Sequence, residues 1–319
     1  MTAGPREPVE QVEFDHDIVI VGGGPAGCSA GIFTARAGLD TAIFDRGRSS
    51  LKQCAHLENF LGFPAGIDIE SFYERIHDHA RTAGCEFVAD LVEAVERTDE
   101  GDGFVVTPAE GDSHTARRVV AATRYDGEYL RGLDDDEAMF ETKRYGEEEY
   151  ERFDREYADR EGRTPVDGLY VASPSAAVDM QAIMAAGRGA RVAHRLIADS
   201  RIAEGWWEAV ADRSDWVRRR AELDEEWTDR RRWVEWFDNR YAADAPVESD
   251  SERYERVRSA VIDVGRASYI DPAEITARKT TGQETLASYL DTEAVLDSID
   301  DERIREYLDS TAERTAGEP

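Results

Sequence analysis

The chain has 319 residues, of which 69 are acidic and 39 are Lys or Arg, and its net charge is −30. No basic stripe rises above this acidic background, which argues against nucleic-acid binding. The three cysteines, Cys28, Cys54 and Cys85, are widely spaced and form no CxxC pair, so we expect neither a disulfide framework nor a metal site; no metal ligands are assigned.

Lysine is nearly absent, because Lys52, Lys143 and Lys279 are the only ones. This composition resembles that of halophilic archaeal proteins, whose acids hold hydrated cations while molar salt screens their repulsion. An ordinary acidic protein with disordered tails is the alternative, but the acids are spread along the whole chain. No signal peptide is recognisable, and no apolar run approaches the ~20 residues that cross a bilayer. We therefore expect a cytoplasmic protein with no membrane partner.

A dinucleotide-binding unit is predicted near the N-terminus. After an arm of residues 1–16, an apolar strand (17–21) leads into a glycine turn and a helix (25–37), and a second strand (41–45) ends on an acid. The expected cofactor-binding residues of this unit are Gly22, Gly24, Pro25, Ala26, Gly27, Asp45 and Arg46. Gly22 permits the tight turn and Gly24 lets a pyrophosphate approach the helix N-terminus, whereas Asp45 would hold the ribose hydroxyls.

The rest of the chain predicts further α/β elements and then a helical, acidic C-terminal region. The expected elements are a helix over 69–83, strands over 86–92, 103–107, 115–122 and 168–172, and a helix over 180–197. The highly charged residues 125–163 are expected to be a linker with one solvated helix. Six tryptophans lie between Trp206 and Trp236, and we favour core packing for them over an exposed docking surface.

Three segments resemble the low-molecular-weight thioredoxin reductases. Leu57–Pro64 (LENFLGFP) resembles the family's ENFPGFP segment beside the flavin, and Val119–Thr123 (VVAAT) resembles its IIATG strand. Residues 168–174 (GLYVASP), with 180–189 (MQAIMAAGRG), resemble its closing GVFAAGD and AAGEG segments. The resemblance covers roughly residues 15–198 and implies FAD as the cofactor.

The resemblance implies a Rossmann-like, three-layer α/β domain that binds FAD, made from residues 17–123 and 165–199. An acidic helical region, residues 200–319, follows it. Residues 124–164 take the place of the family's NADPH domain and are too few for a βαβ unit plus the rest of a domain. The chain has no second GxGxxG motif and no CxxC pair, so we expect no NADPH binding or thioredoxin reduction in the family's manner.

The resemblance also assigns residues around the flavin ring. Asn59 is expected beside the ring, and Thr123 at the carboxyl edge of the sheet. Gln181 and the N–H of Ala182 would stabilise negative charge on the reduced ring; a plain capping role for Gln181 is an equal alternative. Two positions depart from the family: Arg124 replaces a glycine, and Pro174 replaces an aspartate.

Several cysteines and histidines are candidates for other roles. Cys54 precedes the segment beside the ring, which permits a thiol–flavin redox pair, but we favour a buried structural thiol. Cys28 is expected to pack in the core. His77 and His79 face different sides of one helix, so joint metal binding is disfavoured and solvated histidines are expected.

These observations favour a flavoprotein oxidoreductase whose electrons come from an external donor or go to a small acceptor. A ferredoxin-like protein, reduced flavin or a separate reductase would serve as donor, and no catalytic residue is assigned. A non-catalytic FAD- or ADP-binding sensor or assembly protein, acting through the tryptophan-rich helices, is the alternative. A homodimer is left open.

Overall fold

The computed structural model describes residues 13–124, 126–146, 148–173, 181–213, 219–220 and 225–316. The chain divides into two compact units. The larger unit comprises residues 1–215 with 234–261, and the smaller unit comprises residues 216–233 with 262–319. None of the helices in the described part of the chain is both long enough and apolar enough to cross a bilayer.

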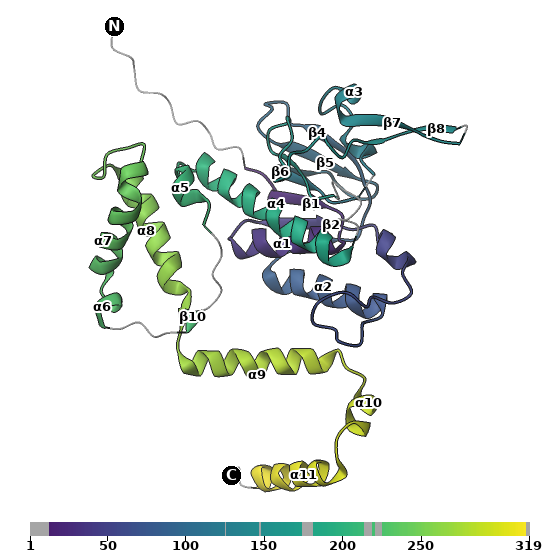
Figure 1. Ribbon diagram of the computed structural model, residues 1–319, viewed down its shortest axis with the longest axis vertical. Helices are drawn as coiled ribbons and strands as arrows, with labels where there is room; N and C mark the ends of the chain where they lie inside the picture. The colour runs from purple at the N-terminus through teal and green to yellow at the C-terminus, as the bar shows by residue number, and fades with distance from the viewer. Residues whose placement is uncertain are drawn as a thin grey trace. The chain divides into compact units, whose positions relative to one another are not determined.

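The larger unit is built on a seven-stranded mixed sheet with the order β3-β2-β1-β6-β5-β4, and β9 also pairs with β6 (Figure 1). Its strands are β1 (His16–Val21), β2 (Thr41–Phe44), β3 (Glu86–Val88), β4 (Val92–Arg97), β5 (Phe104–Pro108), β6 (His114–Ala121) and β9 (Leu169–Val171). Strands β3, β2, β1, β6 and β9 run parallel, whereas β5 is antiparallel to both β4 and β6. The first half of β6 pairs with β5 and its second half with β9, so one strand joins the parallel and antiparallel parts.

Alternate side chains of the parallel strands build a core on each face of the sheet. Ile18 and Ile20 on β1 pack with residues of α1 (Pro25–Arg36) and α4 (Ala182–Ala203). On the other face, Val19 and Val21 pack with side chains of β4, β5 and residues 129–166. The predicted three-layer α/β fold is therefore confirmed. Helix α2 (Ile69–Ala83) has the predicted bounds and ends at Gly84, which is left-handed with φ +111°.

Two expectations about the first hundred residues are wrong. Residues 14–16 are not part of a loose arm: Thr115 donates two hydrogen bonds to the Asp15 carboxylate, from its N–H and its hydroxyl, each at 2.8 Å, and His16 begins β1. The strand expected over 86–92 is two strands, because a turn follows Val88. There the Val88 carbonyl accepts hydrogen bonds from the N–H groups of Asp45 and Asp90.

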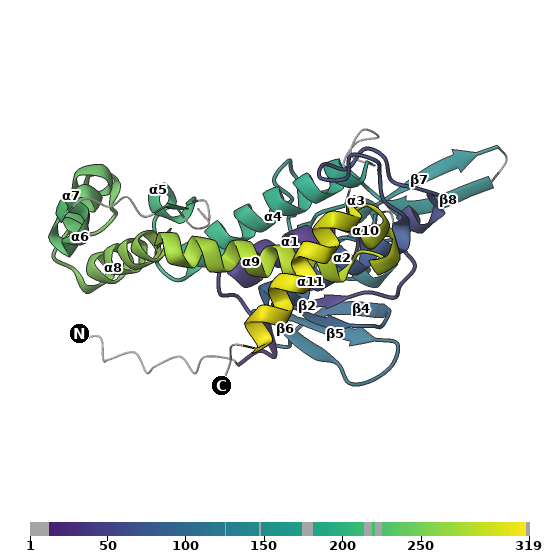
Figure 2. The ribbon, with the colours of Figure 1, turned by 90° about the horizontal axis from the view of Figure 1, so that it is seen from below.

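The segment expected to be a linker with one solvated helix is a β-hairpin with a buried base. Two short helical turns, η2 (Glu128–Leu130) and α3 (Asp136–Met139), precede the strands β7 (Phe140–Tyr145) and β8 (Glu148–Phe153). Phe140 and Phe153 pair at the base and are buried in the core, together with Leu130 and Met139. The hairpin extends away from the sheet in both views (Figures 1 and 2).

The C-terminal region is helical, as expected. Its elements are α5 (Glu208–Ala211), β10 (Arg219–Arg220), α6 (Glu225–Thr228), α7 (Arg230–Tyr241), η4 (Ala242–Asp244), α8 (Glu252–Ala267), β11 (Tyr269–Ile270), α9 (Pro272–Ser288), α10 (Thr292–Asp297) and α11 (Asp301–Ala316). In the larger unit, the Trp207 ring stacks on Tyr254 at 5.6 Å beside Phe237. In the smaller unit, Trp233 donates a hydrogen bond to the Trp227 carbonyl at 2.8 Å. Core packing is thus confirmed for Trp207 and Trp233, which are both buried, whereas Trp216 lies outside the described residues.

Candidate dinucleotide-binding site

The glycine turn between β1 and α1 requires residues without side chains at Gly22 and Gly27. Gly22 is left-handed with φ +113°, and a Cβ atom there would lie 2.7 Å from the Ala122 carbonyl oxygen. A Cβ atom on Gly27 would lie 1.8 Å from the carbonyl oxygen of Gly22. The turn therefore brings the backbone close to β6 and leaves Gly24 as the N-cap of α1, with no side chain between the helix N-terminus and the space in front of it.

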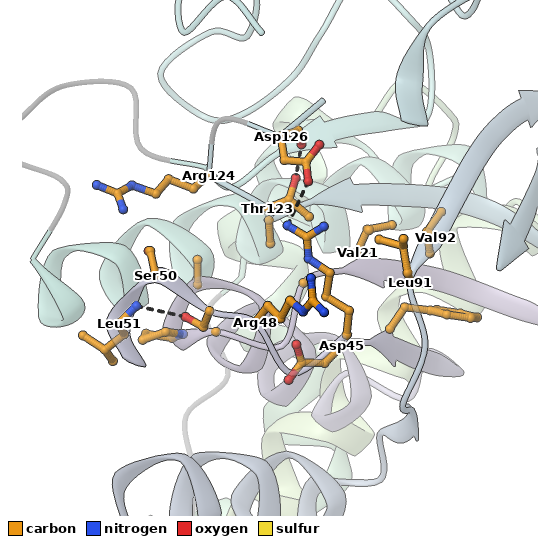
Figure 3. A pocket seen from close by; sticks show the side chains of 18 of the residues that line it. Val21, Asp45, Arg48, Ser50, Leu51, Leu91, Val92, Thr123, Arg124 and Asp126 are labelled. Atoms are coloured by element: carbon orange, nitrogen blue, oxygen red, sulfur yellow. Dashed lines mark hydrogen bonds and ion pairs between the residues drawn. The ribbon is translucent and has the colours of Figure 1, made fainter. Parts of the chain in front are cut away.

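A cavity of about 1000 Å³ opens at the carboxyl ends of β1, β2 and β6, in front of this turn (Figure 3). The predicted site residues that line it are Gly22, Gly24, Pro25, Ala26, Asp45, Arg46, Thr123 and Ala182. Of the other three, Gly27 packs against Gly22 beneath the turn, and Asn59 and Gln181 bond to each other. The carboxyl edge of a parallel sheet is where ligands bind in open α/β folds. The sequence thus predicted the position of this cavity.

Asp45 lies directly after β2 and next to the glycine turn. Its N–H donates to the Val88 carbonyl at 2.9 Å, and its carboxylate accepts a hydrogen bond from the Gly47 N–H at 3.0 Å. A Cβ atom on Gly23 would lie 2.7 Å from the Asp45 Cβ atom, so Gly23 is also needed as glycine. Because the Asp45 side chain packs against Gly23, its carboxylate lies beside the turn, where it can accept hydrogen bonds from ribose hydroxyls.

His77 contacts the same turn from α2, although solvated histidines were expected on that helix. Its Nε2 atom lies 2.8 Å from the Gly23 carbonyl oxygen, to which it donates, and 3.5 Å from Asp45 Oδ2. The spacing that could have revealed this role is its position four residues after Tyr73 and three before Ala80, both of which are buried. His79, by contrast, is exposed.

Thr123 and Arg124 form the turn that follows β6. The Thr123 hydroxyl donates to the Asp126 carbonyl and shares a hydrogen bond of 2.9 Å with the Tyr129 hydroxyl. Arg124 is the one non-glycine residue with positive φ among the described residues, at +70°. A non-glycine residue in this left-handed conformation carries a strain cost of about 1–2 kcal/mol. Pro174, the other departure, lies outside the described residues.

Asn59 and Gln181 meet at the start of α4. The Asn59 side-chain nitrogen donates to Gln181 Oε1 at 2.7 Å. Gln181 is the N-cap residue of α4, but its side chain makes no capping hydrogen bond, which argues against a plain capping role. Ala182, the first residue of the helix, lines the cavity, so the helix N-terminus is directed at it.

The cysteines are divided between the core and the cavity. Cys28 is buried as expected, its thiol donates to the Gly23 carbonyl at 3.2 Å, and burial raises its pKa. Burial likewise raises the pKa of Cys85 to about 12. Cys54 is exposed and lines the cavity, so the expectation of a buried thiol is wrong there. No group of three His, Cys, Asp or Glu side chains among the described residues is arranged to hold a metal ion.

Three arginines and five acidic residues line the cavity. The arginines are Arg46, Arg48 and Arg124, and Arg46 pairs with Asp126 at 3.0 Å between Nη2 and Oδ2. Acidic side chains also line it, including Asp90, Glu93 and Glu128. An open helix N-terminus with nearby guanidinium groups suits an anion, and the carboxylate of Asp45 suits hydroxyl groups. The arrangement therefore fits a phosphate-linked nucleotide.

Sequence comparisons place the N-terminal part of the chain among known proteins. Residues 16–150 match the family described as pyridine nucleotide-disulphide oxidoreductase. A thioredoxin reductase of Streptomyces clavuligerus is 33% identical over 111 residues, which are 34% of this chain and 34% of that protein. Another, from Streptomyces coelicolor, is 32% identical over 127 residues, or 39% of this chain and 38% of that protein. The chain thus spans little more than a third of the length of the curated relatives that it matches.

Solved structures of thioredoxin reductases align with a larger part of the chain at lower identity. The enzyme from Gloeobacter violaceus is 18% identical, with 60% of this chain and 95% of that chain covered and a TM-score of 0.45. The atypical enzyme from Desulfovibrio vulgaris Hildenborough is 20% identical, with 60% and 99% covered and a TM-score of 0.45. The N-terminal part of this chain is therefore similar in sequence to thioredoxin reductases and to the wider pyridine nucleotide-disulphide oxidoreductases.

Proposed function

We propose that the chain binds FAD in this cavity and acts as a flavoprotein oxidoreductase. The observation that carries the proposal is the convergence of three groups on one cavity: the N-terminus of α1, the Asp45 carboxylate and the N-terminus of α4. Its volume of about 1000 Å³ lies at the upper end of ordinary ligand pockets, which suits a dinucleotide. The sequence similarity to thioredoxin reductases supports the same assignment.

Each of these groups has a distinct part in holding the cofactor. The backbone N–H groups around Gly24 and Ala26 bind the pyrophosphate, and Asp45 accepts hydrogen bonds from the ribose of the adenosine. The N-terminus of α4 at Ala182, with the Gln181 amide, faces the flavin and stabilises negative charge on it. The bound flavin supplies the capacity to take up and release electrons, whereas the protein supplies position and electrostatics.

We infer further that the electrons come from an external donor or go to a small acceptor. Between Thr123 and Gly168 the chain provides a β-hairpin and short helical turns, and the sequence has no second GxGxxG motif and no CxxC pair. A nicotinamide domain and a redox dithiol are the parts that a thioredoxin reductase of this class would need. A ferredoxin-like protein, free reduced flavin or a separate reductase is the class of donor that this proposal requires.

The alternative, a non-catalytic FAD- or ADP-binding sensor or assembly protein acting through its tryptophan-rich helices, has less support. Trp207 and Trp233 are buried, and Trp206 and Trp236 pack against the cluster of Trp207, Phe237 and Tyr254. The described tryptophans therefore supply core packing rather than a docking surface.

The test is purification in molar salt, followed by an absorption spectrum and release of the cofactor by heat. We expect a yellow protein from which FAD is released. A colourless protein that also fails to bind added FAD would overturn the proposal. A protein that binds ADP but no flavin would favour the sensor instead.

A further inference from the structure

Helix α2 presents two side chains to the glycine turn, one helical turn apart. The rings of Tyr73 and His77 are in edge-to-face contact, with centroids 5.5 Å apart. His77 donates a hydrogen bond to the Gly23 carbonyl and lies next to the Asp45 carboxylate. Tyr73 lies nearer the N-terminus of α1, and the hydrogen bonding of its hydroxyl group is unexplained by the protein alone.

The Tyr73 hydroxyl is buried without a partner. The side chain is 6% exposed, and its oxygen has no hydrogen-bond partner among the described residues. A buried hydroxyl left unpaired costs about 1–3 kcal/mol, so native proteins rarely keep one without a reason. A ligand that accepts a hydrogen bond would remove this cost.

The hydroxyl is directed at the N-cap of α1. A Cβ atom on Gly24 would lie 3.8 Å from the Tyr73 oxygen and 3.7 Å from the Ser49 hydroxyl oxygen. Gly24 and Ser49 both line the cavity, and Tyr73, which is not itself a lining residue, places its hydroxyl directly behind them. Any side chain at Gly24 would reach toward the two hydroxyl groups.

The groups around this space are suited to an anion. Burial raises the pKa of Tyr73 to about 12, with a smaller opposite effect from the Ser49 hydroxyl, so the phenol is a hydrogen-bond donor at neutral pH. Lys52, one of only three lysines in the chain, places its Nζ atom 5.6 Å from the centroid of the Tyr73 ring. A phosphate group accepts hydrogen bonds and donates none, so it matches the two hydroxyls and the helix N–H groups together.

We propose that Tyr73 and Ser49 bind a phosphate oxygen of the dinucleotide, beside the N-terminus of α1. This inference rests on the proposed function, because it takes FAD as the ligand of the cavity. Tyr73 acts here as a positioning residue: its hydroxyl fixes the pyrophosphate, while His77 fixes the Gly23 peptide of the same turn.

The test compares Tyr73→Phe with Tyr254→Phe by titrating FAD, ADP and adenosine into flavin-stripped protein in molar salt. Tyr254 is also buried, but its hydroxyl donates to Asp238 at 2.9 Å and its ring packs with Trp207 and Phe237 rather than at the glycine turn. Flavin fluorescence and calorimetry report the dissociation constants. We expect Tyr73→Phe to weaken FAD and ADP binding roughly ten- to a hundredfold, as for loss of a hydrogen bond to a charged group. Adenosine binding, and all binding by Tyr254→Phe, should be unchanged.

The outcomes separate this inference from the proposed function. If the unmodified protein binds FAD and Tyr73→Phe binds it equally well, the inference is wrong and the proposed function stands. Equal losses of affinity for ADP and for adenosine would show that Tyr73 only shapes the pocket, and the inference would again be wrong. If the unmodified protein binds neither FAD nor ADP, both fail. Should Tyr73→Phe not fold, Ser49→Ala provides the test, with an expected several-fold loss for ADP and none for adenosine.

Discussion

The Asn59 amide nitrogen and the Gln181 amide oxygen lie 2.7 Å apart in a hydrogen bond that joins residues 122 positions apart in the sequence. Because Gln181 Oε1 accepts this bond, the Nε2 group of Gln181 is its remaining donor group at the start of α4. The bond therefore orients Gln181 as a donor next to a helix N-terminus. Such an arrangement stabilises negative charge on a neighbouring group.

Replacement of Gln181 by Leu should lower the reduction potential of the bound flavin. Loss of one hydrogen bond to the reduced ring, worth about 1–1.5 kcal/mol, corresponds to roughly 20–30 mV for a two-electron couple. Asn59→Ala should shift the potential in the same direction by less. A redox titration measures both, with Gln283→Leu on α9 as the control. An unchanged potential in Gln181→Leu would place Gln181 away from the ring.

Asp45→Asn should weaken FAD binding at least tenfold. Hydrogen bonds from ribose hydroxyls to a carboxylate contribute about 1.5–3 kcal/mol each, and 1.4 kcal/mol is a factor of ten in the dissociation constant. Asp40→Asn, at the opposite end of β2, is the control and should bind FAD normally. Equal affinity in both variants would mean that the ribose is held by other groups.

NADPH alone should not bleach the bound flavin at a rate relevant to turnover, whereas dithionite or photoreduction should bleach it readily. The reason is the proposed lack of a nicotinamide domain, since the described residues between Thr123 and Gly168 form the β7–β8 hairpin and short helical turns. Anaerobic stopped-flow absorbance measures the rate. Rapid bleaching by NADPH would reveal a nicotinamide site and contradict the requirement for an external donor.

Asp199→Asn should destabilise the protein by about 1–3 kcal/mol at neutral pH. Burial raises the pKa of Asp199, but hydrogen bonds from Arg163 and Tyr170 outweigh burial and hold it below the usual value. The stabilisation is thus full above the unfolded pKa of about 3.9 and is lost as the pH falls through the lower folded pKa. Urea unfolding at neutral pH and below pH 4 measures it. The difference between variant and parent should shrink in acid, whereas Asp301→Asn, in an exposed pair, should differ little at either pH.

Lower salt should destabilise the fold. At a net charge of −30, the Debye length grows from about 3 Å at 1 M to about 10 Å at 0.1 M salt, and repulsion then acts between neighbouring carboxylates. We expect loss of tertiary structure below a few tenths molar salt, partly reversed at mildly acidic pH, with the C-terminal region loosening first. Near-UV circular dichroism and melting temperatures measure this. A melting temperature that does not depend on salt would refute the halophilic interpretation.

The sequence was sufficient for the parts of the fold that are set by local patterns. The apolar run of β1, the glycine turn and the acid after β2 together predicted a cofactor site at the end of the sheet where the cavity lies, because local backbone requirements set this turn. The role of His77 was missed because it depends on which face α2 turns toward the glycine turn, and this is a tertiary contact.

The β7–β8 hairpin was missed for a different reason. Its strands lack the usual alternation of apolar and polar residues, because charged side chains pair with each other instead. Glu141 pairs across the hairpin with Arg152 at 2.7 Å and with Lys143 on its own strand at 2.6 Å. Among the described side chains of the two strands, only those at the apolar ends, Phe140 and Phe153, are buried. Charges that compensate each other across two strands cannot be recognised before the pairing of the strands is known.

Strand β9 and helix α4 contact the first half of the fold at two places. Neither contact involves the chain that connects β6 to β9. Strand β9 pairs with β6 through Leu169 and Val119, and a Cβ atom on Gly189 of α4 would lie 2.0 Å from the Ala26 carbonyl oxygen on α1. Because each doubling of a connecting loop costs only about 0.6 kcal/mol, the length of the intervening segment is nearly free to vary. The tip of the hairpin at Gly146 is accordingly a graft point, at which a reductase or an electron-carrier protein could be fused to supply electrons from within the same chain.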